Sequence, residues 1–208
     1  MNDYSLSESI FLTPTPRGAY YATASPEPEA ARAVLQGLMS RDTTGPASPE
    51  DLQAWTGESD NLALLYRMER INWVAGQAEG QTLAARNLQD DMPRYLAELS
   101  AEGRALLADT HGFPLAQAGF AHELSEELAL FGAEIASLQN KYSNMIRGSL
   151  RLASPALGLV DAAGNSQLGA WPLYVGSQQF MLIIEGMPMF DRPAFLQLVW
   201  GLCWRYGA

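Results

Sequence analysis

One long segment with an apolar face constrains the fold of this chain more than any other feature. Between Ala121 and Tyr142, large apolar residues recur at alternating steps of four and three positions: Leu124, Leu128, Phe131, Ile135 and Leu138. This spacing places the five side chains along one side of an α-helix. Further apolar residues widen the surface: Ala129, Leu130, Ala133 and Ala136. The helix therefore has more than one face to bury, one on its own sheet and one on a partner, unless all of it packs within one chain.

The segment before this helix is typical of a β-hairpin. Two short apolar runs, 105–108 and 113–120, flank the turn sequence Asp109-Thr110-His111-Gly112. Gly112 can adopt the positive φ that such a turn needs. A helix that carries Met92, Tyr95, Leu96 and Leu99 is expected before the hairpin.

Three further strands and a last helix are expected after the long helix. Apolar runs at 157–160 and 168–174 flank a turn, and 179–185 has the strongest strand pattern in the sequence. The sequence Asp191-Arg192-Pro193 then begins a helix. Residues 87–208 thus follow the order helix, two strands, long helix, three strands, helix.

Residues 1–86 show a different pattern, made of short helices. Ser25-Pro26-Glu27 and Ser48-Pro49-Glu50 each combine a capping serine, a proline in the first turn and an acid, and they predict helices that end near Ser40 and Trp55. A third helix is expected over 60–70, and two strands over 71–76 and 81–85. Regular structure is expected to fail at Pro14 and Pro16, and an extended segment to resume at 19–22. Three helices followed by a hairpin are typical of a winged helix-turn-helix.

The charge of this half bears on what it binds. It holds eleven acidic residues against six arginines, a net charge of −5, and the whole chain carries −10. Arg67 and Arg70 are the candidates for nucleic-acid contact on the third helix, but Glu58 and Asp60 lie at the start of that helix. Because each phosphate contact needs a cation, the charge favours a protein-docking module and leaves DNA binding as the alternative.

The sequence offers few groups for chemistry. His122-Glu123 resembles the start of a zinc-binding helix, but a second histidine does not follow at the required spacing. A Gly-rich phosphate loop is also missing, and the acids Glu123, Glu126, Glu127 and Glu134 fit a solvated helix face. We therefore expect a non-enzymatic protein without catalytic residues, metal or cofactor. Lys141, Arg147 and Arg151 form a local basic cluster, which is either simply solvated or contacts an acidic or phosphate-bearing partner.

Composition favours a folded protein of a reducing compartment. The hydrophobic fraction is 48% and the charged fraction 17%. The lone cysteine, Cys203, lies among apolar residues and is expected to be a buried thiol. The sequence has neither an apolar leader nor a run of bilayer-spanning length. A cytoplasmic location without membrane insertion is the expectation.

The second half resembles a known family. The stretch from Leu106 to Ala116 is similar to the first hairpin of the Roadblock/dynein light chain superfamily, with an apolar strand, an Asp-x-x-Gly turn and a second strand. The long helix at 121–142 and the strand Phe180–Ile184, followed by a helix, fit the same pattern. The family includes bacterial Mgl-type proteins, which partner small Ras-like GTPases. The resemblance covers residues 87–208; the segment 142–155 is longer than the family usually has there, and 1–86 lies outside the family's minimal domain.

The element order of residues 1–86 and the resemblance of residues 87–208 together predict an α+β protein with two domains, a winged-helix-like domain at 1–86 and a Roadblock-like domain at 87–208. The second domain would be a five-stranded antiparallel sheet with packed helices that forms a homodimer, in which long helices pack together and sheets join edge to edge. The implied function is a scaffold that docks a small Ras-like GTPase and either regulates or only tethers it, with the winged helix as a second protein-binding surface. The alternative is a transcription regulator that binds DNA through its winged helices and dimerises through the second half.

Overall fold

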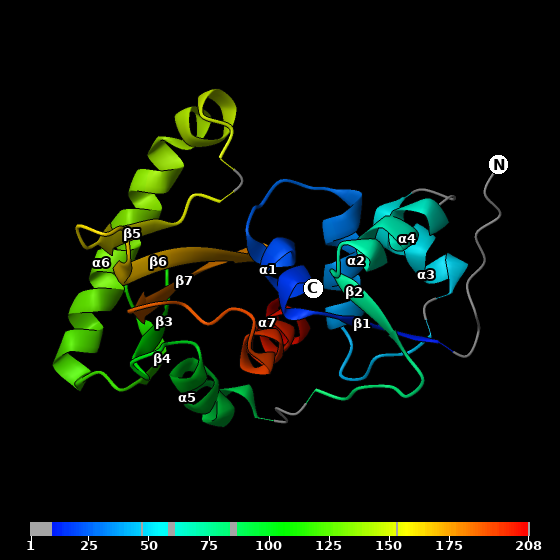
Figure 1. The fold of residues 1–208 in the computed structure, drawn as a ribbon, viewed down its shortest axis with the longest axis horizontal. Coiled ribbons are helices and arrows are strands. Elements are labelled where there is room, and N and C mark those ends of the chain that lie inside the picture. The colour runs from blue at the N-terminus through cyan, green and yellow to red at the C-terminus, as the bar shows by residue number, and fades with distance from the viewer. Residues whose placement is uncertain (1–9, 47, 58–60, 84–86, 153, 208) are drawn as a thin grey trace.

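The computed structural model describes residues 10–46, 48–57, 61–83, 87–152 and 154–207, and these have an α+β fold (Figure 1). The first part of the chain contains β1 (Phe11–Pro14), α1 (Pro16–Thr23), α2 (Ala30–Met39), α3 (Pro49–Thr56), α4 (Leu62–Arg70) and β2 (Val74–Gln77). The second part contains α5 (Leu88–Glu98), β3 (Ala105–Asp109), β4 (Pro114–Ala118), α6 (His122–Lys141), the π-helical turn η1 (Asn144–Ser149), β5 (Leu157–Val160), β6 (Ser166–Val175), β7 (Gln178–Glu185) and α7 (Pro193–Tyr206).

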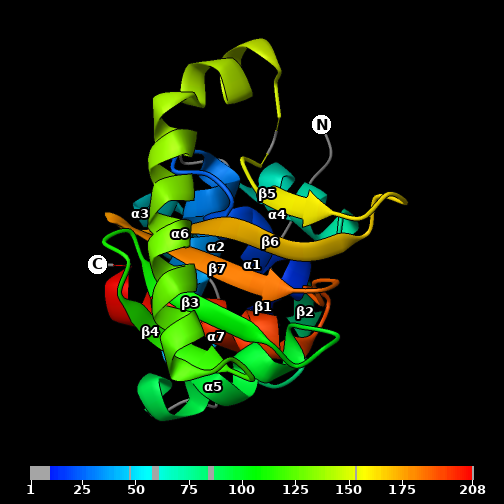
Figure 2. The same cartoon turned by 90° about the vertical axis from the view of Figure 1, so that its left-hand side faces the viewer.

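The second part forms a five-stranded antiparallel sheet, as predicted. Its strand order is β4-β3-β7-β6-β5, with β7 in the centre. Alternate residues of β7 serve opposite faces, because side chains alternate along a strand. Met181 and Ile183 belong to the cluster under α6, whereas Phe180, Leu182 and Ile184 belong to the larger core on the other face. Figure 2 shows α6 crossing the sheet on the first of these faces.

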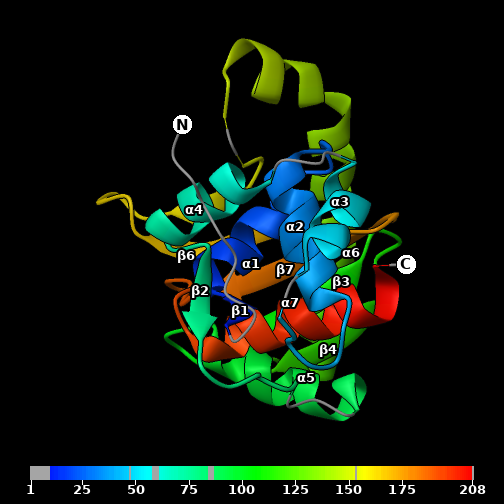
Figure 3. The same ribbon diagram turned by 90° about the vertical axis from the view of Figure 1, so that its right-hand side faces the viewer.

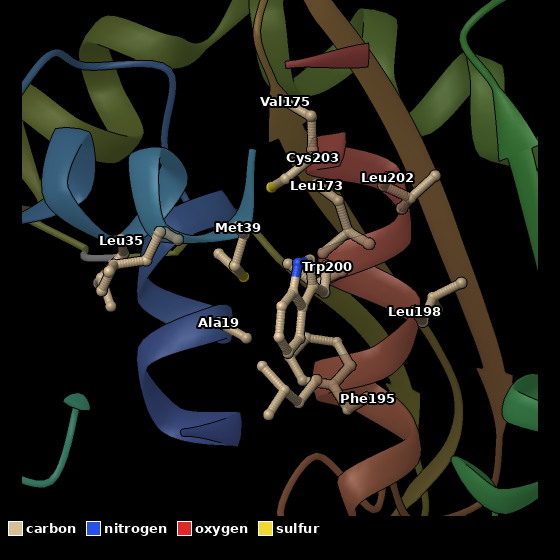
Figure 4. Packing of buried hydrophobic residues seen from close by; sticks show 14 of the residues in the cluster. Ala19, Leu35, Met39, Leu173, Val175, Phe195, Leu198, Trp200, Leu202 and Cys203 are labelled. Carbon is tan, nitrogen blue, oxygen red and sulfur yellow. The ribbon is translucent and has the colours of Figure 1, made fainter. Parts of the chain in front are cut away.

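The larger core joins both parts of the chain. Helix α7 is buried on almost every side, because it lies between the sheet and the helices α1 and α2. Figure 4 shows Trp200 and Phe195 of α7 facing Ala19, Leu35 and Met39 of the first part. The division into domains at residue 86 stays a prediction, and the two parts share one hydrophobic cluster.

Two predicted helices of the first part are confirmed. Ser48 caps α3 by accepting a hydrogen bond from the Asp51 backbone N–H at 3.1 Å, while the Asp51 carboxylate accepts one from the Ser48 N–H. Gly57 ends this helix in the left-handed region, with φ 74°. Helix α2 begins only at Ala30, later than its Ser25 signal predicts. The expected third helix is α4, and Figure 3 shows these helices on the side of the molecule opposite to α6.

The prediction of extended structure at 19–22 is wrong, because these residues belong to α1. Thr15 caps this helix, since its side-chain oxygen accepts a hydrogen bond from the Gly18 N–H at 3.1 Å. Pro16 occupies the first turn, where backbone N–H groups have no acceptor within the helix, so the lack of an N–H in proline costs no hydrogen bond. The proline therefore starts a helix here.

The predicted hairpin of 71–76 with 81–85 is also wrong. Strand β2 pairs antiparallel with β1, in a register that places Leu12 opposite Gly76. Thr82 forms an isolated bridge with Thr43, and 84–86 lie outside the described residues. The partner of β2 thus comes from the start of the chain, so the first part is a helical region with a small two-stranded sheet.

Candidate interaction surface on helix α6 and strand β5

Helix α6 lies on the sheet through its small and polar residues. The residues of its buried face recur with the period of a helix: Ser125, Ala129, Gly132, Ala136 and Gln139. Gly132 shows how close the approach is, because a Cβ built on it would lie 2.9 Å from Cδ1 of Ile183. The narrow side chains of this face allow the helix axis to sit near the strands.

The large apolar residues of α6 consequently face outward or sideways. Leu124, Phe131 and Leu138 are between 40% and 47% exposed. Leu128 and Ile135 are only partly buried, against the small cluster under the helix. The predicted stripe is thus a single helical face. Leu128 and Ile135 contribute to its packing on the sheet, whereas Leu124, Phe131 and Leu138 remain largely outside this contact.

Strand β5 continues this apolar surface. It is the edge strand next to β6, and all four of its residues are exposed. Leu159 and Val160 are 60% and 61% exposed. An exposed, apolar edge strand is a site for pairing with another strand. The apolar run at 157–160 predicts the strand, but local sequence alone does not place the strand at the exposed edge of the sheet.

Together these residues form what we call the α6–β5 seam, made of Leu124, Phe131, Leu138, Leu157, Leu159 and Val160. A groove of about 240 Å³ runs between the two elements, and Ile135 and Leu168 line it as well. Figure 2 shows β5 beside α6 at one edge of the sheet. Contiguous exposed apolar surface of this kind marks a protein interaction site more often than an ordinary surface.

The predicted basic cluster is divided between different environments. Arg147, in η1, pairs with Glu27 at 3.6 Å and donates a hydrogen bond to the Tyr174 hydroxyl at 3.2 Å, so it joins the two parts of the chain. Burial raises the pKa of Tyr174, and the nearby Arg147 charge opposes that rise. Lys141 and Arg151 are exposed, and the Lys141 ammonium lies 5.5 Å from the ring centroid of Tyr142.

The residues proposed for nucleic-acid contact lie on the last turn of α4. Both Arg67 and Arg70 are exposed, and the guanidinium of Arg70 lies 5.9 Å from the ring centroid of Tyr66. Glu69 is exposed on the same turn. The two arginines thus present cations to solvent beside an acid, and the strand that follows α4, β2, pairs with β1.

The side chains considered as candidates for catalysis or metal binding are either exposed on α6 or buried in the core. His122 lies 3.5 Å from Glu126 on an exposed helix start, and the acids Glu123, Glu126, Glu127 and Glu134 are all exposed. Cys203 is buried, and this burial raises the pKa of its thiol to about 12. Among the residues that the structure describes, three or more His, Cys, Asp or Glu side chains do not gather into a group that could hold a metal ion.

Each helix in the described part of the chain is too short or too polar to cross a bilayer. Comparisons with family models, curated proteins and solved structures find no match to this chain.

Proposed function

We propose that this chain is a non-enzymatic interaction protein of the Roadblock type, which forms a homodimer through the α6–β5 seam. One observation carries the proposal: α6 buries its small residues on the sheet and leaves Leu124, Phe131 and Leu138 outward, beside an exposed apolar edge strand. A helix that packs only within its own chain normally buries its large apolar side chains, because they contribute most to the hydrophobic effect.

A second copy is the occupant that suits this surface. A twofold axis beside β5 brings the same strand of the partner into an antiparallel position, and it brings the two α6 helices together. Each seam would then cover the other, and the sheets would join into one. The element order from α5 to α7 and the strand order β4-β3-β7-β6-β5 support the Roadblock comparison.

The partner of the dimer is proposed to be a small Ras-like GTPase, on the basis of the resemblance. An apolar patch outside the seam supports a further partner surface. At the turn between β3 and β4, Gly112 lies against Leu130 of α6, since a Cβ on Gly112 would be 2.8 Å from the Leu130 Cδ2. Leu130 and the neighbouring Phe113 are both strongly exposed. A GTPase partner also agrees with the expected cytoplasmic location, and the winged-helix-like first part would add another protein-binding surface.

The test combines the oligomeric state with capture of the GTPase. Sedimentation velocity of the full chain at high micromolar concentration should show a dimer. A Ras-like GTPase encoded beside this chain, loaded with GTP and then with GDP, should be captured in a nucleotide-dependent manner. Phe113→Glu should weaken capture of the GTPase while the chain remains a dimer. Lys141→Gln and Arg151→Gln test whether the exposed basic residues contribute to this capture. A monomeric chain, or capture that is absent with both nucleotides, would contradict the proposal.

The DNA-binding alternative makes a different prediction. The exposed pair Arg67 and Arg70 on one turn of α4 is the observation that favours it. Fluorescence titration with duplex DNA at physiological salt should then show binding tighter than the non-specific level, and Arg67→Glu should weaken it. Equal DNA binding by the wild type and the Arg67→Glu variant, or only weak, salt-sensitive binding, argues against this alternative.

A further inference from the structure

A cavity of about 450 Å³ lies over α1, where the first part of the chain meets the loop between β7 and α7. Its floor is one face of α1, which presents Arg17, Tyr20 and Tyr21. Trp73 and Phe190 contribute to its walls. The volume is within the range of small-molecule sites in proteins. The α6–β5 seam contributes no residue to it, so a ligand bound here would be independent of the proposed dimer.

The walls of this cavity are held in place by contacts between rings. Tyr21 stacks on Trp73, with ring centroids 3.7 Å apart and planes at 21°. Tyr20 lies 5.4 Å from Phe190, and its hydroxyl donates a hydrogen bond to the Ser154 Oγ at 3.1 Å. The cavity therefore has preorganised aromatic surfaces, which suit a flat ring in offset or edge contact.

A buried cation lies at the same cavity. Arg32 is only 6% exposed, and its guanidinium lies 4.9 Å from the ring centroid of Tyr21. Nε donates to the Tyr21 carbonyl at 3.4 Å, Nη1 donates to the Glu27 carbonyl, and Nη1 is 3.9 Å from the Glu29 carboxylate. The Nη2 group makes no hydrogen bond with a residue that the structure describes. Burial lowers the pKa of Arg32, but a guanidinium remains protonated at neutral pH.

The charge around the cavity favours an anion. Its lining contains two cations, Arg17 at the exposed rim and Arg32 inside, against one carboxylate, Asp191, which is exposed. Glu29 and Glu27, which are not part of the lining, partly offset the charge of Arg32, and the Glu29 carboxylate also accepts a hydrogen bond from the Tyr21 hydroxyl. The residues that line the cavity thus carry one more cation than carboxylates, in a chain with a net charge of −10. An anion that accepts hydrogen bonds from a guanidinium makes shorter and stronger bonds than a neutral acceptor does.

We propose that this cavity binds a small planar aromatic anion, in which the ring lies against the Tyr20, Tyr21 and Trp73 side chains and a carboxylate or phosphate group pairs with Arg32 and Arg17. The two arginines have different roles. Arg32 is a fixed donor, because its position is set by the backbone carbonyls of Tyr21 and Glu27. Arg17 is an exposed residue that closes the pair from the rim.

The test uses NMR of the full chain, with the indole N–H of Trp73 as the reporter, assigned by its loss in Trp73→Phe. Phenyl phosphate and benzoate are the probes, and benzyl alcohol and inorganic phosphate are the matched controls that lack the charge or the ring. We expect at least one aromatic anion to shift the Trp73 signal saturably and to bind about tenfold tighter than either control. The better probe identifies the anionic group. The seam contains no tryptophan, so adventitious binding there does not move this signal.

Variants separate the site from general anion attraction. Arg17→Glu should weaken binding of the aromatic anion by about tenfold, and Arg67→Glu, an equal charge change on exposed α4, should leave it unchanged. Arg32→Gln should weaken it further, with circular dichroism as the check of folding. The proposal is overturned if neither aromatic anion shifts Trp73, if benzyl alcohol or inorganic phosphate binds as tightly, or if Arg17→Glu and Arg67→Glu have equal effects.

Discussion

The indole Nε1 of Trp200 donates a hydrogen bond to the backbone carbonyl of Arg41 at 2.6 Å, across 159 positions of the sequence. Trp200 lies in α7 and is fully buried, while Arg41 follows α2 in the first part of the chain. The bond lies where the N-terminal helices cover α7, which itself rests on the sheet (Figure 4). The first part of the chain is thus the outer layer of a core that it shares with the second part.

Trp200→Phe should destabilise the whole protein. The substitution removes the indole donor and leaves the Arg41 carbonyl without this partner, which costs about 1–3 kcal/mol before the loss of packing volume is added. Urea unfolding, followed by circular dichroism, measures the free energy of unfolding. Trp204→Phe is the matched control on the same helix, where the side chain is 45% exposed, and it should change stability by less than about 0.5 kcal/mol. Equal effects of the two variants would contradict the role given to the bond.

Phe131→Glu should break the proposed dimer and leave the fold intact. The side chain is partly exposed at the centre of the seam, so a charge is tolerated in the monomer but not in a dry interface. Loss of a central aromatic contact typically costs about 2 kcal/mol, which weakens dimerisation by about thirtyfold. Sedimentation equilibrium gives the dissociation constant. Glu127→Gln, on an exposed position of the same helix, should leave the constant unchanged; a dimer that survives Phe131→Glu places the interface elsewhere.

Gly132→Leu should lift α6 from its sheet. Even a Cβ at this position would lie 2.9 Å from the Ile183 Cδ1 and 3.4 Å from the Met181 Cβ. A larger side chain overfills the contact, which typically costs about 1–3 kcal/mol. Thermal unfolding measures the loss. Gly148→Ala is the control, because a Cβ there meets nothing within 4 Å and stability should be nearly unchanged. Wild-type stability of Gly132→Leu would show that the helix does not pack as described.

The thiol of Cys203 should link stability to alkaline pH. Burial raises its pKa from the ordinary value of 9.0 to about 12, so the folded chain keeps this proton at pH values where the unfolded chain loses it. The contribution to stability is therefore complete below about pH 9 and is lost as the pH rises toward about 12. Urea titrations over this range should show a smaller pH dependence for Cys203→Ala than for the wild type.

A thiol reagent supplies the second measurement for Cys203. The folded chain should react slowly at neutral pH, because the thiol is both buried and protonated, and it should react rapidly once it is unfolded in urea. Equal reaction rates in both states would show that the thiol is accessible, and identical pH dependence of the wild type and Cys203→Ala would show that folding does not raise the pKa of the thiol.

Local patterns predict much of the secondary structure. The capping residues before α3, the periodic apolar residues of α6 and the apolar run of β7 each act within a few positions of the chain, so they can be read directly. The prediction at Pro16 fails because a proline can end one element and begin another, and Thr15 decides between the two through its capping bond. The prediction for the partner of β2 fails because β1 is remote in sequence.

The candidate site is predictable only in part, because some of its residues follow a local pattern and others are brought together from remote segments. The period of the sequence identifies the stripe from Leu124 to Leu138, but Leu159 and Val160 join it only through the position of β5 at the sheet edge. The predicted basic cluster likewise does not reveal that Arg147 pairs with Glu27. Arg32 gives no signal as a buried cation, since its neighbours come from α1 and the loop before α2.

By itself, the sequence determined the α+β class, the position of most helices and strands, and the two-sided apolar character of α6, because propensity and periodicity are properties of neighbouring residues. Only the tertiary structure decided that the small residues of α6 meet the sheet, that β5 lies at its open edge, and that α7 is covered by the first part of the chain. These outcomes depend on packing between segments far apart in sequence, where shape and the removal of apolar surface from water set the arrangement.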